Sequence, residues 1–67
     1  HDALPILKFA AAVAETGMLL RDSEFKGKSS YDSVVSLLDS IPDIKNDTSK
    51  LEFLLLVKKM ATLAKEQ

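Results

Sequence analysis

The sequence contains no cysteine and no tryptophan, and its only histidine is His1. Without cysteine the chain can form no disulfide bond, so its stability must come from the packing of its own side chains. We interpret His1 as the remnant of a tag, which leaves the remaining chain without the residue that most often serves as a general acid or base. The sequence therefore predicts a protein that is not an enzyme and has no catalytic residue.

Sequence motifs that bind cofactors or metal ions are also missing. Neither of the two glycines belongs to a phosphate-binding loop. Asp39, Asp43 and Asp47 recur at intervals of four residues, but Pro42 interrupts any helix that they could share. Their spacing also differs from that of a calcium loop, which needs oxygen ligands at alternate positions and a glycine. We interpret these acids as solvated residues around a helix end, and we expect no metal ion and no cofactor.

The chain has no large excess of charge of either sign, since it carries nine basic and ten acidic residues and a formal net charge of −1. The two kinds of residue are interleaved, which argues against the concentrated positive field that nucleic-acid binding needs. A nucleic-acid-binding helical domain stays a weak alternative that requires four lysines to gather in space, namely Lys26, Lys28, Lys58 and Lys59. No apolar run approaches the roughly 20 residues of a membrane span, so we expect no direct membrane insertion.

Aliphatic residues, by contrast, are abundant, and hydrophobic residues make up 46% of the 67-residue chain. They recur with helical spacing in three segments, and no segment of useful length alternates as a strand does. We predict helices over about residues 4–22, 30–41 and 49–65, which form an all-α, small three-helix bundle. We interpret residues 1–67 as a single helical domain cut from a larger protein, with residues 1–4 as a tag remnant or linker.

The helical spacing also predicts which side chains face the core. The predicted inward residues of the first helix are Ile6, Phe9, Ala10, Val13, Gly17 and Leu20, with Ala12 and Leu19 opposite. Those of the second helix are Tyr31, Val34, Val35, Leu38 and Ile41. Those of the third helix are Phe53, Leu56, Val57, Met60, Ala61 and Ala64.

Local signals refine this picture at three points. Ala10, Ala14 and Gly17 follow each other at helical spacing, and we expect this strip to be the place where a neighbouring helix approaches closely. Pro42 is predicted to end the second helix, because a residue before proline is driven out of helical geometry. At the start of the third helix, a capping box is predicted from Ser49 and from Glu52 three residues later.

Leucines outside the predicted inward faces are the candidates for docking a partner. Leu51 and Leu55 are predicted to point to the solvent side of the third helix, and Leu19 is a weaker case of the same kind. Two explanations stay open: the loop over residues 23–29 covers Leu51 and Leu55, or they remain exposed for a partner. We also expect Arg21, Phe25 and Tyr31 to anchor this loop, with Arg21 as a hydrogen-bond donor and Phe25 folded back on the core.

Residues 9–27, followed by residues 30–34, resemble a C-terminal domain of unknown function found in bacterial envelope proteins that carry a von Willebrand factor type A domain. The most specific cue is the pattern Leu-Leu-Arg-x-Ser-Glu-aromatic-x-Gly over residues 19–27. Glu52 and Phe53, with residues 56–58, are similar to the last helix of the same family. Thr16 departs from the family, which often has an aromatic residue there, and residues 49–51 replace a Gly-Tyr-Arg run.

This resemblance implies a non-enzymatic accessory or protein-interaction domain. Its implied partners are the upstream von Willebrand factor A-type domain of the same chain and an unknown protein, and its implied location is the cell envelope. None of the residues that would hold the metal ion of an A-type domain occurs in this chain. The alternative is a purely structural helical cap that stabilises the upstream domain and recognises nothing.

Overall fold

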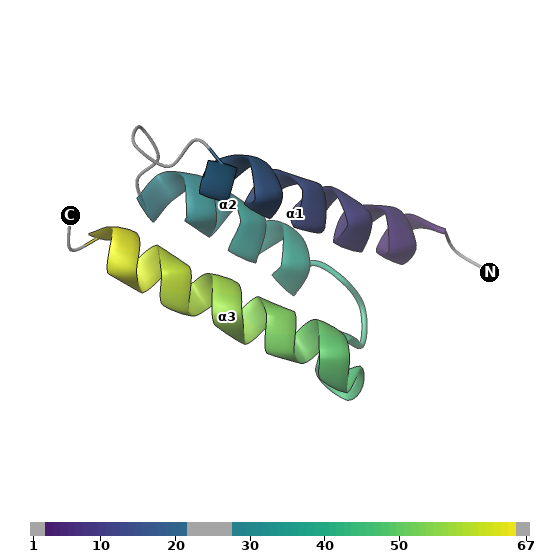
Figure 1. Ribbon diagram of the computed structural model, residues 1–67. Coiled ribbons are helices and arrows are strands. Elements are labelled where there is room, and N and C mark those ends of the chain that lie inside the picture. The colour runs from purple at the N-terminus through teal and green to yellow at the C-terminus, as the bar shows by residue number, and fades with distance from the viewer. Residues whose placement is uncertain (1–2, 22–27, 66–67) are drawn as a thin grey trace.

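The computed structural model describes residues 3–21 and 28–65, apart from the side chains of residues 28, 29 and 65. It contains α1 (Leu4–Arg21), α2 (Lys28–Asp39), the short 3₁₀ helix η2 (Ile44–Asn46) and α3 (Thr48–Lys65). The three long helices run side by side, with α2 between α1 and α3 (Figure 1). The prediction of an all-α three-helix bundle is confirmed, and no strand occurs within the described ranges.

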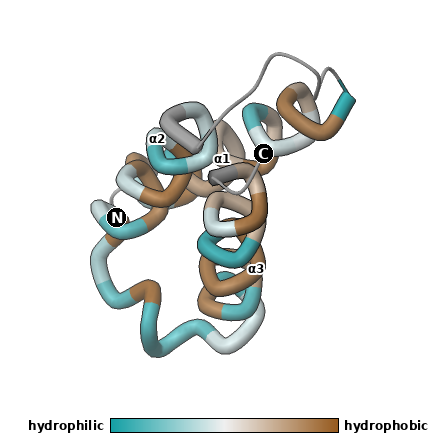
Figure 2. The backbone as a smooth tube through the Cα atoms, turned by 90° about the vertical axis from the view of Figure 1, so that its left-hand side faces the viewer, coloured by the Kyte–Doolittle hydropathy of each residue, from teal (hydrophilic) through white to brown (hydrophobic). Residues whose placement is uncertain are grey.

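The core lies where the three helices face one another, and α2 contacts both of the other long helices there. Tyr31, Val34 and Leu38 are buried on one face of α2, as their spacing predicts. Ile41 and Ile44 continue this apolar surface beyond the end of the helix. Apolar segments occur in all three long helices, whereas the connection between α2 and α3 is mostly hydrophilic (Figure 2). The inward face of the second helix is therefore confirmed.

The inward face predicted for α1 is wrong except at Phe9, which is partly buried and packs against the core. Its buried residues are Ala12, Thr16 and Leu19, whereas Ile6, Val13 and Leu20 are exposed. Apolar residues surround most of this helix, so their periodicity could not select one face. The polar Thr16 can enter the core because its hydroxyl donates to the Ala12 carbonyl at 2.8 Å.

The small-residue strip of α1 is also placed differently from the prediction. Ala10, Ala14 and Gly17 are exposed, and a Cβ atom added to Gly17 would meet no atom within 4 Å. None of the described helices therefore packs against α1 at Gly17. The close packing that we expected there is instead made on the opposite side of α1, where Ala12 is fully buried.

The predicted inward face of α3 is correct in part. Val57 and Ala61 are buried, but the largest buried side chain of this helix is Leu54, and Leu56 is exposed. Phe53, Met60 and Ala64 lie partly buried at the edge of the core. Three consecutive leucines, residues 54–56, offer a hydrophobic side chain to every direction around the helix, so the pattern alone could not decide which one faces inward.

The connection between α2 and α3 differs from the prediction at both ends. Helix α2 ends at Asp39, before the predicted boundary, and the Ser40 hydroxyl donates to the Leu37 carbonyl at 2.6 Å. Asp43, just after Pro42, adopts a left-handed backbone conformation with φ 59°. Such a conformation is uncommon for residues other than glycine, although aspartate tolerates it better than most.

Helix α3 begins two residues earlier than the capping box predicts, and its cap is Asp47. The Asp47 Oδ1 atom accepts a hydrogen bond from the Lys50 backbone N–H at 3.2 Å. The Lys50 Nζ atom lies 3.1 Å from Asp47 Oδ2 and 5.4 Å from the centroid of the Phe9 ring. Phe9 in turn packs edge-on against Phe53, with ring centroids 5.6 Å apart. The start of α3 is thus fastened to α1.

Candidate interaction faces

The side of α1 that points away from the bundle is apolar, and we call it the outer face of α1. Its large side chains have 44–67% of their surface exposed, namely Ile6, Leu7, Val13, Met18 and Leu20. The small residues Ala10, Ala14 and Gly17 lie among them. Because these residues are distributed over most of the helix length, they form a face rather than isolated exposed positions.

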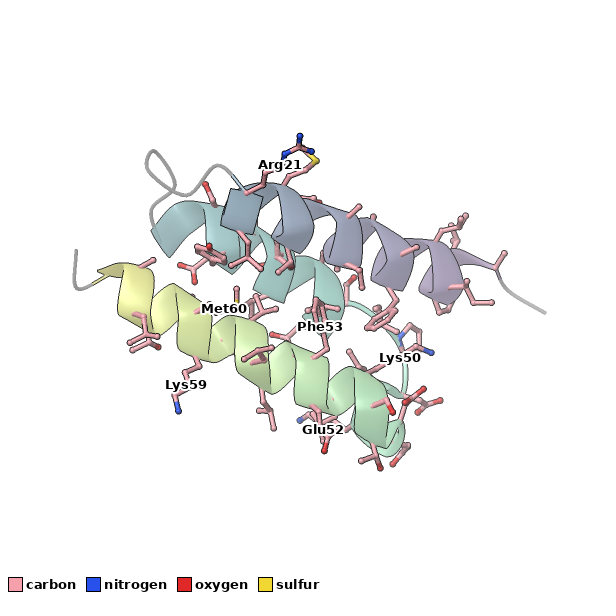
Figure 3. All side chains as sticks on the ribbon, in the orientation of Figure 1. Arg21, Lys50, Glu52, Phe53, Lys59 and Met60 are labelled. Carbon is pink, nitrogen blue, oxygen red and sulfur yellow. The ribbon has the colours of Figure 1, made fainter. Side chains whose placement is uncertain are left out.

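Charged residues of α1 lie at the margins of this face. The Lys8 Nζ atom reaches the Ser40 carbonyl at 3.5 Å, which places Lys8 on the flank next to the end of α2. Glu15 is exposed on the same flank by helical spacing. Arg21 stands at the last residue of the helix and points away from α2 and α3 (Figure 3). The outer face of α1 therefore carries no charge along its middle.

A second apolar surface follows the side of α3 opposite to the core, and we call it the outer face of α3. Leu55, Leu56 and Leu63 are each 54–55% exposed there. Glu52 and Lys59 are exposed on the same side, and both side chains point away from α2 (Figure 3). This face differs from the outer face of α1 because it combines leucines with one acidic and one basic side chain.

The leucines predicted to dock a partner are divided by the structure. Leu55 is exposed, as expected. Leu51 is only partly buried and packs against the core. The expectation that Leu19 faces solvent is wrong, because Leu19 is 9% exposed and belongs to the core. Whether Leu51 or Leu55 docks a partner stays a prediction.

The predicted loop anchors are only partly described by the structure. Tyr31 is buried in the core, and Arg21 is exposed at the end of α1. Phe25 lies outside the described residues. An anchoring role for these three residues therefore stays a prediction.

Among the charged groups of the described residues, Asp47 has a clear structural role at the start of α3. Hydrogen bonds from the Lys50 backbone and side chain lower the pKa of Asp47 below its usual value, with the nearby Lys50 charge adding to them. Asp39 and Asp43 are exposed, and no group of three potential metal ligands occurs among the described residues. Of the four lysines considered for nucleic acid, Lys58 and Lys59 are exposed on α3, whereas Lys26 and the Lys28 side chain lie outside the described part.

Sequence reasoning missed the outer face of α1, although one signal was available. This helix has only Lys8, Glu15 and Arg21 as charged residues, which is few for a helix with one solvent-exposed side. A helix that is apolar almost all round is typical of an element that is covered on more than one side. None of the described helices combines the length and the apolar character needed to cross a membrane.

Residues 2–63 match the family described as "Uncharacterized protein YfbK, C-terminal". No curated protein matches the chain, and no solved structure matches it either.

Proposed function

Because the chain belongs to the YfbK C-terminal family, we propose that it is a non-enzymatic accessory domain that docks onto the part of the polypeptide preceding it. The observation that carries this proposal is the outer face of α1, which the bundle leaves uncovered. A family defined as the C-terminal part of a protein has other protein segments before it, and these are the nearest available partners for this face.

The size of the outer face of α1 supports docking. Its five large side chains expose on the order of 500 Å² of apolar surface, which is comparable to the largest patch on a typical monomer. Burial of such a surface is favourable by roughly 25 cal/mol per Å² before the cost of ordering the two partners. A covalent connection reduces that cost, because tethering raises the effective concentration of the partner to the millimolar range.

The small residues favour a helix as the docked element. Ala10, Ala14 and Gly17 allow another backbone to approach α1 closely, and the open space around Gly17 leaves room for it. In the proposed complex the strip serves the helix crossing that the sequence predicts, but with a helix from outside the described bundle. The resemblance noted above implies that the preceding part includes a von Willebrand factor A-type domain and that the protein resides in the cell envelope.

Hydrogen exchange tests the docking directly. The 67-residue chain is compared with a longer protein that includes the preceding part. We expect slower amide exchange in α1 of the longer protein and little change in α3, because docking restrains only the helix that it covers. Equal exchange of α1 in the two proteins would argue against docking.

A matched pair of variants gives the same test a control. In the longer protein, Ala14→Lys places a charge in the middle of the outer face and is expected to restore fast exchange in α1. Glu15→Lys places the same residue one position along, on the flank, and is expected to leave the exchange slow. Both positions are exposed, so neither variant should unfold the 67-residue chain.

Removal of this domain from the longer protein distinguishes a recognition module from the structural-cap alternative. Removal of a cap lowers the melting temperature of the preceding domain but leaves capture of its partner intact. Removal of a recognition module abolishes that capture. The longer open reading frame also tests the implied context, since a signal sequence and an upstream Asp-x-Ser-x-Ser pattern are expected in it.

A further inference from the structure

The outer face of α3 carries a charge pattern that its own bundle does not use. Glu52 and Lys59 lie seven residues apart, which is about two turns or roughly 10 Å along one stripe of the helix. Within the described residues neither of them forms an ion pair. Leu55 and Leu56 lie between them along the helix, and both are more than half exposed.

This pattern is complementary to itself when the helix direction is reversed. With a two-fold axis between positions 55 and 56, an antiparallel copy of α3 brings its position 59 opposite position 52. Glu52 of each copy then faces Lys59 of the other, which forms two symmetric ion pairs. Leu55 and Leu56 of both copies meet at the centre, where contact removes their exposed apolar surface from water.

We propose that two copies of this chain associate through the outer faces of α3 in this antiparallel arrangement. A parallel arrangement in register would place Glu52 against Glu52 and Lys59 against Lys59. Like charges in direct opposition disfavour that alternative, so the pattern selects the helix direction as well as the surface. The bundle does not obstruct the contact, since Leu54, Val57 and Ala61 face the core on the other side of α3.

The exposed area limits the size of the dimer interface. The three leucines expose roughly 300 Å² in each copy, so the interface is smaller than the roughly 1,200–2,000 Å² of a stable complex. The dimer is therefore weak, with a dissociation constant on the order of 10–1,000 μM. It uses a surface on a different helix from the outer face of α1, so its failure would leave the proposed docking of α1 untouched.

Charge reversal tests the pairing by sedimentation equilibrium of the 67-residue chain over roughly 10–1,000 μM protein, a range chosen for a weak interface. Lys59→Glu alone and Glu52→Lys alone each replace two attractive pairs by two repulsive ones, and we expect about tenfold weaker association. The double variant Glu52→Lys/Lys59→Glu restores opposite charges and is expected to return association to near the original strength. Lys58→Glu is the matched control, because it makes the same charge change at an exposed neighbour and should leave association unchanged.

Disulfide cross-linking tests the helix direction, and the absence of native cysteine makes it specific. Leu55→Cys lies next to the two-fold axis and is expected to form a covalent dimer under mild oxidation. Leu63→Cys lies about 22 Å from its counterpart in the antiparallel dimer and is expected to stay monomeric. Purely monomeric protein, no recovery in the double variant, or cross-linking of Leu63→Cys in preference to Leu55→Cys would each overturn the proposal.

Discussion

The second helix and the first helix of this bundle distribute their apolar residues in opposite ways. Helix α2 concentrates them on one face, with Tyr31, Val34 and Leu38 buried and polar residues on the other side. Helix α1 carries apolar residues around most of its circumference, yet it buries only Ala12, Thr16 and Leu19. The bundle thus buries the main apolar face of α2, whereas α1 keeps a large apolar surface exposed.

The largest expected effect on stability comes from truncating one leucine on each of these two helices to alanine. Leu38 is fully buried on α2, so Leu38→Ala should destabilise the chain by about 2–5 kcal/mol through lost burial and a residual cavity. Leu7 is 60% exposed on α1, and Leu7→Ala is expected to change the free energy of unfolding by less than about 0.5 kcal/mol. Chemical denaturation of the 67-residue chain measures both.

A large loss of stability in Leu7→Ala would mean that the outer face of α1 is covered in the isolated chain. The comparison between the two helices would then fail. A loss confined to Leu38→Ala would support it.

The same contrast explains how far the sequence could predict the fold. The inward face of α2 follows largely from spacing, because most residues on its other side are polar; Leu37 is the apolar exception and packs partly buried against the core. The faces of α1 and α3 do not follow, since Leu19 and Leu20 compete in α1 and residues 54–56 compete in α3. In both cases the choice is made by tertiary packing, which a single amphipathic pattern does not encode.

The helix ends show the same limit. The capping box at Ser49 and Glu52 is a valid local signal, but Asp47 is an equally good cap two residues earlier. Contact of Lys50 with Phe9, which comes from a distant part of the chain, favours the arrangement that is observed. The outer face of α1 was missed because a surplus of apolar residues was interpreted as core.

A smaller effect, of opposite sign, is expected at Gly17. The space around it is open, so Gly17→Ala adds a methyl group without a clash. We expect about 1 kcal/mol of added stability, because alanine restricts the unfolded chain and favours the helix. Thermal unfolding of the isolated chain measures it, and a lower melting temperature would mean that a helix already crosses α1 at this point.

Gly17→Ala also tests where the proposed docked element crosses α1. In a longer protein whose preceding part crosses α1 at the small-residue strip, the added methyl group would lie in the contact. The stabilising effect on the isolated chain should then be accompanied by weaker protection of α1 from hydrogen exchange in the longer protein. An increase in protection there would indicate that the docked element avoids Gly17.

The smallest expected effect concerns the start of α3, where the Asp47 carboxylate caps the helix. The pKa of Asp47 is lowered in the folded chain from its usual value of 3.8, so its contribution to stability is present above that value and is lost as the pH falls below it. Asp47→Asn keeps an acceptor for the Lys50 N–H but does not titrate. We expect the melting temperature of the original chain to fall more than that of Asp47→Asn between about pH 6 and pH 3. Parallel curves for the two proteins would mean that the carboxylate charge adds nothing to the cap beyond the hydrogen bond that asparagine also accepts.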